Sequence, residues 1–352
     1  MTVRPRPVVD LIPAYRPGKA AASEVLKLSS NENPFPPLPG VVERAAAELA
    51  RMNRYPDAGN TALREALAGH LDVGTDQIVA GTGSVAVLFA VLQTFLSPGD
   101  EIVHAWRSFE AYPIAADLTG ATAVRVPLSA DGRHDIEAMV AAVTDRTRVV
   151  LVCTPNNPTG PIVTAAELQT LLDRVRDDVL VVVDEAYVEF VRDPDVCSGL
   201  EALRQRDNVV TLRTFSKAYG LAGLRVGYAV AHPDVAAAVA KVVPPFSVNL
   251  VAAAAAIASL EAVDDLAERV QRLVDERARV RESLLDQGWQ VPDAQGNFVW
   301  LPLGADALRF ADACDPVAVR PFDGDGVRIS IGETGVDAQL LQAAAAWRDR
   351  HG

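Results

Sequence analysis

The sequence predicts an α/β fold in which a mostly parallel sheet flanked by helices forms a large domain, followed by a small C-terminal α+β domain. Three segments carry this prediction, because each is a continuous run of β-branched and apolar residues that ends abruptly in polar residues; they begin at Arg148, Val179 and Asn208. Such runs are typical of strands that are buried on both faces of a parallel sheet. Stretches with a helical period separate them, so strand and helix alternate along the chain.

Changes in composition and periodicity along the sequence predict an arm and two domains. Residues 1–40 are rich in proline and lack a helical period, so we expect an N-terminal arm. Residues 41–243 hold the alternating pattern and form the expected large domain. The last part, 244–352, begins with two prolines, becomes rich in alanine and then in charge, and ends with short apolar runs around 297–303 and 327–331. We expect it to be the small domain.

Periodicity places several individual elements. Helices are predicted at about 41–52, after Thr61, and over the long charged stretch 263–287. A short apolar run at 77–80 predicts a strand, which is followed by a glycine turn and then by a helix through Leu96.

Composition excludes several functional classes. With 33 basic and 46 acidic residues among 352, the net charge of −13 disfavours nucleic-acid binding. The three cysteines form no C-x-x-C pattern, which disfavours a disulfide framework and a zinc knuckle and fits a reducing compartment. No apolar run approaches the roughly 20 residues that span a bilayer, and no signal peptide is evident. We expect a soluble, cytoplasmic protein without membrane partners.

Asp184 closes one of the predicted buried strands. Its carboxylate should therefore lose water and need a cation to stay ionised, yet no Lys or Arg stands beside it in the sequence. It could simply cap the next helix. Alternatively, its partner is a ligand cation such as a protonated pyridine nitrogen.

Lys217 ends another of these strands and is one of only four lysines in the chain. It could be an ordinary surface residue. The other lysines lie in the arm or beside the Pro-Pro pair, however, so Lys217 is the candidate for a Schiff base with an aldehyde. Such chemistry requires a lowered amine pKa, to which Arg225 could contribute.

The turn at residues 81–84, Gly-Thr-Gly-Ser, offers backbone N–H groups and a helix N-terminus to an anion. It also fits the dinucleotide pattern G-x-G-x-x-A, which leaves an NAD(P)-dependent oxidoreductase as a remote alternative. The acids Asp100 and Glu101 begin the following strand instead of ending it, so a single phosphate fits better. Further donors to such a phosphate would be Thr214, Ser216 and Arg225.

Asn157 stands in Asn-Pro-Thr-Gly, which by itself is a strong turn. Its place at a strand end favours a hydrogen bond to a ligand oxygen. The five histidines show no metal-ligand spacing and Ser84 lacks a G-x-S-x-G frame, so we expect neither a metal site nor a serine triad.

Taken together, these motifs resemble the fold-type I, pyridoxal-phosphate-dependent aminotransferases of class I and II, within their histidinol-phosphate aminotransferase-like branch. Seven motifs occur in the family's order. They are Ser30-Asn-Glu-Asn-Pro, Arg54-Tyr-Pro-Asp, Gly81-Thr-Gly-Ser, Asn157-Pro-Thr-Gly, Asp184-Glu-Ala-Tyr, Ser216-Lys-Ala-Tyr-Gly-Leu-Ala-Gly-Leu-Arg and Val327-Arg-Ile-Ser. The resemblance covers nearly the whole chain and implies pyridoxal 5'-phosphate as cofactor and a homodimer.

The resemblance also implies a role for each cofactor-site residue. Lys217 would bond to the cofactor aldehyde and then move the substrate proton, while Asp184 would keep the pyridine nitrogen protonated. Asn157 and Tyr187 would hydrogen-bond the phenolic oxygen, and Phe109 would stack on the ring. The residues that would hold the phosphate are Gly83, Ser84, Thr214, Ser216 and Arg225, joined by Tyr55 of the neighbouring subunit.

For the substrate, the resemblance implies that Arg328 clamps the α-carboxylate, although a strand-edge salt bridge is an alternative role for this arginine. Three further residues would line the substrate pocket: Tyr15, Asn31 and Arg320.

Some positions depart from the histidinol-phosphate pattern. Val85 and Ala86 stand where an acidic residue is usual, Phe109 replaces a tyrosine, and Val-Arg-Pro-Phe occupies 319–322. These departures resemble the aromatic amino acid (phenylalanine) aminotransferases of the same branch. The expected reaction interconverts a phenylalanine-like amino acid and its 2-oxo acid, with 2-oxoglutarate and glutamate as the other pair.

Histidinol-phosphate aminotransferase, acting in histidine biosynthesis, remains the alternative, and decarboxylation on the same cofactor is a further one. The sequence contains residues that could line either an apolar pocket for an aromatic side chain or a cationic pocket for a phosphate tail. Apolar walls could come from Tyr15, Trp106 and Phe246, and additional cations for a phosphate tail from Arg16, Lys19 and Arg320.

Overall fold

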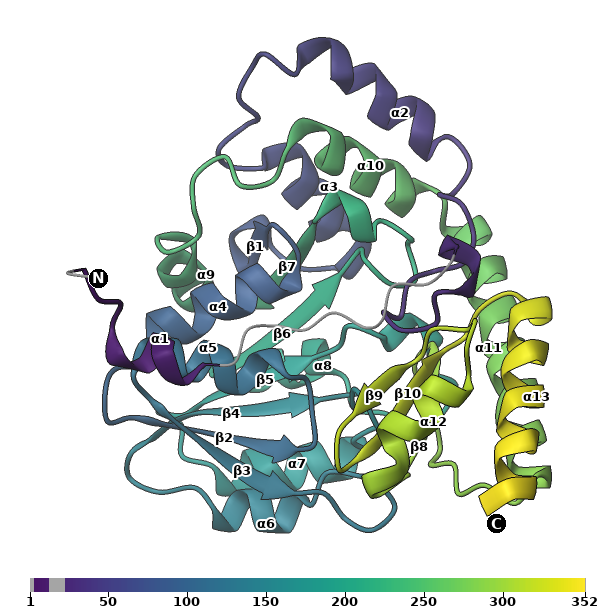
Figure 1. Cartoon of the computed structure of the whole chain (residues 1–352). Helices are drawn as coiled ribbons and strands as arrows, with labels where there is room; N and C mark the ends of the chain where they lie inside the picture. The colour runs from purple at the N-terminus through teal and green to yellow at the C-terminus, as the bar shows by residue number, and fades with distance from the viewer. Residues whose placement is uncertain (1–2, 13–22, 352) are drawn as a thin grey trace.

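A seven-stranded sheet organises the larger part of the molecule (Figure 1). The computed structural model describes residues 3–12 and 23–351. The strands are β1 (Ile78–Gly81), β2 (Glu101–Trp106), β3 (Thr122–Pro127), β4 (Thr147–Cys153), β5 (Leu180–Asp184), β6 (Val209–Thr214) and β7 (Gly227–Ala231). Their order is β1-β7-β6-β5-β4-β2-β3, and all pairs are parallel except those that β7 makes with β1 and β6. The mainly parallel sheet confirms the predicted α/β class.

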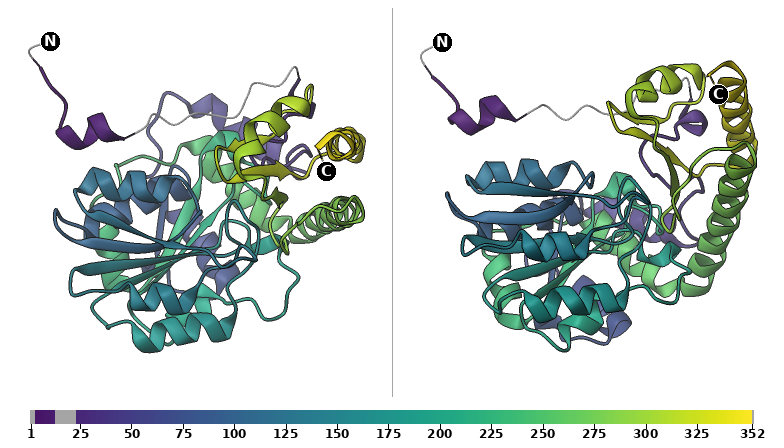
Figure 2. Two further views of the ribbon diagram at one scale, coloured as in Figure 1. Left: turned by 60° about the horizontal axis from the view of Figure 1, so that its bottom comes forward. Right: turned by 90° about the horizontal axis from the view of Figure 1, so that it is seen from below.

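Helices cover both faces of this sheet (Figure 2). In β5, Leu180 and Val182 face one core and Val181 and Val183 face the other, as the alternation of strand side chains requires. The first core is closed by α4 (Ser84–Phe95), α5 (Ala111–Thr119) and α9 (Pro233–Ala240). The second is closed by α3 (Thr61–Leu71), α6 (Ile136–Ala141), α7 (Ala165–Arg174), α8 (Gly199–Leu203) and α10 (Leu250–Glu261). The continuous apolar runs of the sequence are therefore strands buried on both faces.

A second, antiparallel sheet of three strands lies beside the large one. Its order is β8-β10-β9, with bounds Phe298–Leu301, Gly326–Ser330 and Arg320–Phe322. The long charged stretch forms α11 (Val263–Asp286), as predicted, and α11 contacts the last helix, α13 (Thr334–His351). The short helix α12 (Ala307–Ala313) contacts β9 and β10.

The N-terminal segment connects the two sheets. Its first helix, α1 (Pro7–Leu11), contacts α5, and α2 (Val41–Glu48) packs on α10. Between them, Ser330 N–H donates to the carbonyl of Leu28 at 2.9 Å, which ties the segment to β10. Asn33 Nδ2 donates to the carbonyl of Ala218 at 2.9 Å, on the side of the large sheet. The described part of this segment therefore bridges both sheets, and none of the described helices is long and apolar enough to cross a membrane.

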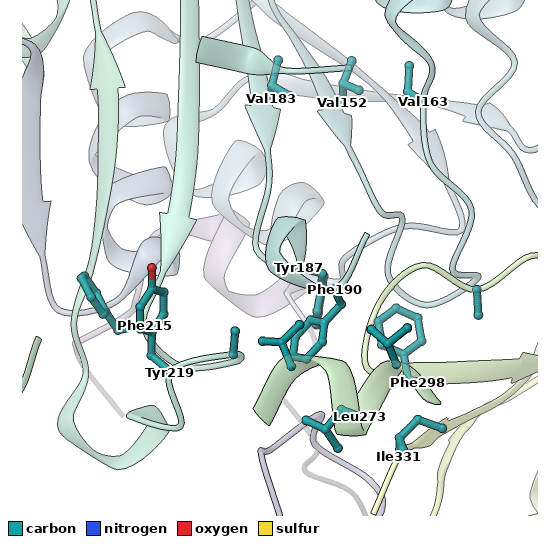
Figure 3. Packing of buried hydrophobic residues seen from close by; sticks show 14 of the residues in the cluster. Val152, Val163, Val183, Tyr187, Phe190, Phe215, Tyr219, Leu273, Phe298 and Ile331 are labelled. Carbon is teal, nitrogen blue, oxygen red and sulfur yellow. The ribbon is translucent and has the colours of Figure 1, made fainter. Parts of the chain in front are cut away.

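Aromatic packing fixes the junction between the sheets (Figure 3). Tyr187 and Phe190, just after β5, are buried, and the Tyr187 ring meets Phe298 of β8 edge-on at 5.1 Å between centroids. Leu273 of α11 and Ile331 after β10 belong to the same core. The end of β5 consequently packs against the small sheet.

Candidate active site

A cavity of about 240 Å³ lies where the parallel strands end and the two sheets meet. This is the position expected of ligand sites in α/β sheets. Most residues predicted for the site line it. They are Ser84, Phe109, Asn157, Asp184, Tyr187, Thr214, Ser216, Lys217, Arg225 and Arg328. Residues that are up to 244 positions apart in sequence thus converge on one cavity.

Lys217 follows β6 and directs its amine into the cavity. The Nζ atom donates a hydrogen bond to the carbonyl of Ser30 at 3.1 Å. Burial, reinforced by the positive charges of Arg328 and Arg225 and opposed by Glu32, lowers the pKa of Lys217 to about 7. A large fraction of the amine is therefore neutral near physiological pH, which is the form that attacks a carbonyl.

Asp184 ends β5 with only 6% of its surface exposed. The phenol of Tyr112 donates to its Oδ2 at 2.8 Å, and the N–H of Ala186 donates to Oδ1 at 3.2 Å. Burial raises the pKa of Asp184 to about 6 despite these bonds. Within residues 3–12 and 23–351 no Lys or Arg forms an ion pair with it, so this carboxylate suits a cation supplied by a ligand, such as a pyridinium N–H.

Hydrogen-bond donors converge at the N-terminus of α4. Gly83 has φ +89° there, and a Cβ at this position would lie 2.5 Å from Arg225 Nη2, so the guanidinium crosses the start of the helix. Arg225 Nη1 donates to Ser216 Oγ at 3.3 Å, and Thr214 Oγ1 lies 3.0 Å from the same oxygen. The helix terminus, two hydroxyls and a guanidinium form a donor set that fits a phosphate group.

A buried polar network surrounds Arg328 of β10, which also lines the cavity. Its Nη1 donates to Asn157 Oδ1 at 2.7 Å and its Nη2 to the carbonyl of Ser29 at 2.6 Å. Asn31 Nδ2 donates to Tyr187 Oη at 2.9 Å. Burial raises the pKa of Tyr187 to about 12, so its phenol stays protonated and can donate to an oxygen in the cavity.

Some predicted site residues do not line the cavity. Asn31 is fully buried and donates a hydrogen bond to the lining residue Tyr187. Arg320 of β9 forms an ion pair with Glu110 at 2.9 Å. Tyr55 is 81% exposed and stacks on Phe246, with 4.7 Å between ring centroids.

Other predicted residues lie elsewhere as well. The guanidinium carbons of Arg107 and Arg125 lie 4.5 and 4.6 Å from the ring centre of Trp106. Outside the described residues lie Tyr15, Arg16 and Lys19.

The structure adds two groups that the sequence reasoning missed. Tyr112 belongs to α5 and reaches Asp184 from a neighbouring element, although its position three residues after Phe109 gave no signal of this contact. The acceptor for Lys217 is a backbone carbonyl of the N-terminal segment, and no residue type identifies such a group.

The residues present fit pyridoxal phosphate on structural grounds. Within the described residues, the cavity combines a lysine amine of lowered pKa, a buried carboxylate without an ion-pair partner, a phosphate-type donor set and the ring of Phe109. Among the described residues, no three His, Cys, Asp or Glu side chains gather as a metal site would require.

The chain is similar to known proteins over nearly its whole length. Residues 23–345 match the family Aminotransferase class I and II. The chain is 53% identical over 348 residues to an aromatic amino acid aminotransferase of Streptomyces coelicolor, covering 97% of each, and 51% identical over 351 residues to one of Thermobifida fusca, covering 98% of each. Among solved structures, histidinol-phosphate aminotransferase from Sinorhizobium meliloti in complex with pyridoxal-5'-phosphate superimposes with a TM-score of 0.90 at 27% identity, covering 100% of this chain and 99% of that one.

Proposed function

The chain belongs to the class I and II aminotransferases, and from this premise we propose that it interconverts a phenylalanine-like amino acid and its 2-oxo acid, with 2-oxoglutarate and glutamate as the other pair. The observation that carries the proposal is the similarity over nearly the full length, at 51–53% identity, to relatives named aromatic amino acid aminotransferase. Histidinol-phosphate aminotransferase is the second candidate, favoured by the structural neighbour at 27% identity.

The cofactor, pyridoxal phosphate, supplies an electron sink for the charge that develops when the substrate Cα–H bond breaks. In the proposed arrangement, Asp184 would hold the ring nitrogen, and Asn157 and Tyr187 would hold the phenolic oxygen. Phe109 would stack on the ring. The phosphate would be held by the start of α4, with Gly83 and Ser84, and by Thr214, Ser216 and Arg225.

Lys217 has two tasks in this proposal. Its amine, which the lowered pKa keeps partly neutral, would hold the cofactor through its aldehyde. The same amine would take the proton from the substrate Cα as general base and return it as general acid. The carbonyl of Ser30, 3.1 Å from Nζ, orients the amine.

Arg328 clamps the α-carboxylate of the substrate in the proposed complex. Two of its nitrogens are held by Asn157 and by the Ser29 carbonyl, so the guanidinium is fixed before substrate arrives. A preorganised guanidinium pairs with a carboxylate more specifically than an ammonium can. The clamp therefore orients the Cα–H bond relative to Lys217.

A homodimer acting in the cytoplasm completes the proposal. Tyr55 and Phe246 are both exposed and stack on each other, and exposed aromatic side chains of this kind are common at protein interfaces. In a dimer Tyr55 would reach the phosphate of the partner's cofactor. Sedimentation analysis of the wild type and of Tyr55→Asp, which places a charge beside Phe246, tests this part.

Steady-state kinetics with the holoenzyme test the reaction. We expect phenylalanine with 2-oxoglutarate to give a kcat/KM at least tenfold above that of histidinol phosphate with 2-oxoglutarate. The opposite order would establish the second candidate. Release of carbon dioxide without 2-oxo acid formation would refute both.

A further inference from the structure

Asn31 is anchored to both sheets at their junction. Its side chain is fully buried, and its Nδ2 donates to Tyr187 Oη at 2.9 Å, just after β5 of the large sheet (Figure 3). On the side of the small sheet, its backbone N–H donates to Ser330 Oγ at 2.7 Å, and its carbonyl accepts from Asn297 Nδ2 at 3.1 Å. The position of the Asn31 amide is therefore fixed from several directions.

The backbone turns sharply at Asn31. Its φ of +53° lies in the left-handed region, which asparagine adopts more readily than most side chains do. At this turn the carbonyl of Ser30 accepts a hydrogen bond from Lys217 Nζ, while the side chain of the next residue contacts Tyr187. One turn of the N-terminal segment therefore contacts two of the residues that are proposed to act on the cofactor.

The hydrogen bonds of Asn31 have a defined direction. Ser330 Oγ accepts the backbone N–H of Asn31, and its own single proton goes to Asn31 Oδ1, which lies 2.9 Å away. The amide therefore presents its oxygen to Ser330 and its NH₂ group to Tyr187. Because an NH₂ group only donates, Tyr187 Oη is the acceptor in this bond.

The hydroxyl proton of Tyr187 must consequently point away from Asn31. Burial raises the pKa of Tyr187 to about 12, so the phenol keeps this proton. Within residues 3–12 and 23–351 no group accepts it in a hydrogen bond, and Tyr187 lines the cavity. The bond from Asn31 also makes Tyr187 a better donor, since hydrogen bonds in a chain polarise one another.

We propose that Asn31 is a positioning residue that directs the hydroxyl proton of Tyr187 into the cavity, toward the phenolic oxygen of the cofactor. This role differs from the contact with substrate that the resemblance implied for Asn31. The inference rests on the proposed function, because it takes Tyr187 as a partner of the phenolic oxygen.

The pH titration of the bound cofactor makes this role measurable. A donor to the phenolic oxygen stabilises its negative charge and weakens its hold on the proton that it shares with the nitrogen of Lys217. The visible absorption of the substrate-free holoenzyme follows the loss of this proton. Tyr187→Phe removes the donor, so the midpoint pH should rise by about one unit, as expected for a hydrogen bond to a charged group.

The other titratable and charged groups around Tyr187 remain unchanged in the variants below. They are Cys153, Asp184, Lys217 and Arg328.

Asn31→Asp keeps the size of the side chain and replaces its donor with an acceptor. Oδ1 still accepts from Ser330, but the hydroxyl of Tyr187 should now donate to the new carboxylate instead of to the cavity. We expect the midpoint to rise by about one pH unit. In the Tyr187→Phe background the same change should raise it by less than half as much, because no hydroxyl remains to turn.

Asn31→Gly is a second variant, which removes the amide without adding charge. Glycine adopts the φ of +53° without strain, so the turn is kept. The midpoint should rise by about 0.5 pH unit, and this rise should vanish in the Tyr187→Phe background.

Asn208→Asp is the matched control. Asn208 Nδ2 donates to the carbonyl of Val179 at 2.7 Å, at the end of β5 and β6 that is remote from the cavity. The exchange also replaces an amide donor with a charge, but it should leave the midpoint unchanged.

Three results would overturn the inference. Equal rises in both backgrounds would show that Asn31→Asp acts through its charge alone. A lower free energy of unfolding with an unchanged midpoint would show that Asn31 only joins the two sheets. A raised KM for the amino acid with an unchanged midpoint would make Asn31 a substrate ligand.

The titration separates this inference from the proposed function because it requires no substrate. A holoenzyme that does not transaminate phenylalanine refutes the proposed reaction and leaves the titration intact. A midpoint that responds to Tyr187→Phe but not to the Asn31 variants refutes the inference alone. An unchanged midpoint in Tyr187→Phe overturns both the inference and the proposed contact of Tyr187 with the phenolic oxygen.

Discussion

The phenol of Tyr112 donates a hydrogen bond to Asp184 Oδ2 at 2.8 Å, and both side chains are buried. Tyr112 lies on α5, 72 positions earlier in the chain, so the helix that covers the sheet also fixes the carboxylate at the end of β5. Burial and the nearby carboxylate raise the pKa of Tyr112 well above its ordinary value, so the phenol keeps its proton and remains a donor. This bond opposes the effect of burial on Asp184.

Replacing Tyr112 with phenylalanine should therefore raise the pKa of Asp184 in the apoprotein above about 6. When folding raises the pKa of an acid, the free energy of unfolding falls as pH rises from the ordinary pKa to the folded one, because in this window the unfolded chain has already given up the proton that the folded chain still binds. In Tyr112→Phe the pKa of Asp184 in the folded chain is higher, so the free energy of unfolding continues to fall up to a higher pH than in the wild type. Relative to the wild type, the free energy of unfolding should fall by about 1.5 kcal/mol between pH 5 and pH 8, the size of a hydrogen bond to a charged group.

Urea unfolding of the apoprotein across this pH range measures the effect. Tyr228→Phe is the matched control, because it removes a buried phenol that lies beside Arg213 instead of Asp184. A parallel pH dependence in Tyr112→Phe and the wild type would contradict the assigned role of this bond.

The sequence predicted the strands that form the centre of the sheet because their apolar runs are continuous. It did not predict β7, which enters antiparallel between β1 and β6, since a hydrophobic pattern carries no information on strand direction or order. The three-residue strand β9 was also missed, because Arg320-Pro-Phe shows no period. Its existence depends on pairing with β10.

Site residues that directly follow a buried strand were predictable from the sequence. Asp184, Asn157 and Lys217 were singled out by polar residues after buried runs, and they line one cavity. Tyr112 and Glu110 were not predicted, because they stand at the start of a helix and their side chains contact residues of other elements. Such contacts depend on tertiary packing, to which local sequence gives no guide.

The amine of Lys217 should titrate near pH 7 in the apoprotein, since burial and two arginines lower its pKa to about 7. Above this pH the amine is neutral and reacts with acylating reagents. Competitive acetylation followed by mass spectrometry should give Lys217 a midpoint about three pH units below that of a free lysine side chain, whose pKa is about 10.4. Lys241 provides the internal comparison, and equal midpoints for the two would refute a perturbed amine.

Glycine at position 227 should be required for the phosphate cradle. A Cβ there would lie 2.3 Å from the Ser84 amide nitrogen and 2.8 Å from the Gly83 carbonyl carbon, both of them backbone atoms that cannot turn away. Gly227→Ala should therefore separate β7 from the start of α4, lower the free energy of unfolding by more than 2 kcal/mol and weaken cofactor binding at least tenfold.

Gly69→Ala is the matched control for this substitution. Gly69 lies within α3 and a Cβ there meets nothing within 4 Å, so alanine should stabilise the chain by about 0.5–1 kcal/mol. Thermal unfolding and fluorescence titration with pyridoxal phosphate compare the two variants. Normal cofactor affinity in Gly227→Ala would show that the approach of β7 to α4 does not shape the cradle.

Arg328→Lys should separate substrate binding from cofactor binding. The guanidinium reaches Asn157 Oδ1 and the Ser29 carbonyl at once, and a lysine ammonium cannot make both bonds while also presenting a parallel pair of donors to a carboxylate. We expect the KM for phenylalanine to rise 10- to 100-fold, as loss of a bidentate charged contact predicts. The dissociation constant for pyridoxal phosphate should change less than threefold, because Arg328 is not among the proposed phosphate donors. Arg272→Lys, an exposed arginine on α11, controls for the exchange of side-chain type. If the KM for phenylalanine stayed at the wild-type value while cofactor affinity fell, Arg328 would be a support for Asn157 and not the carboxylate clamp.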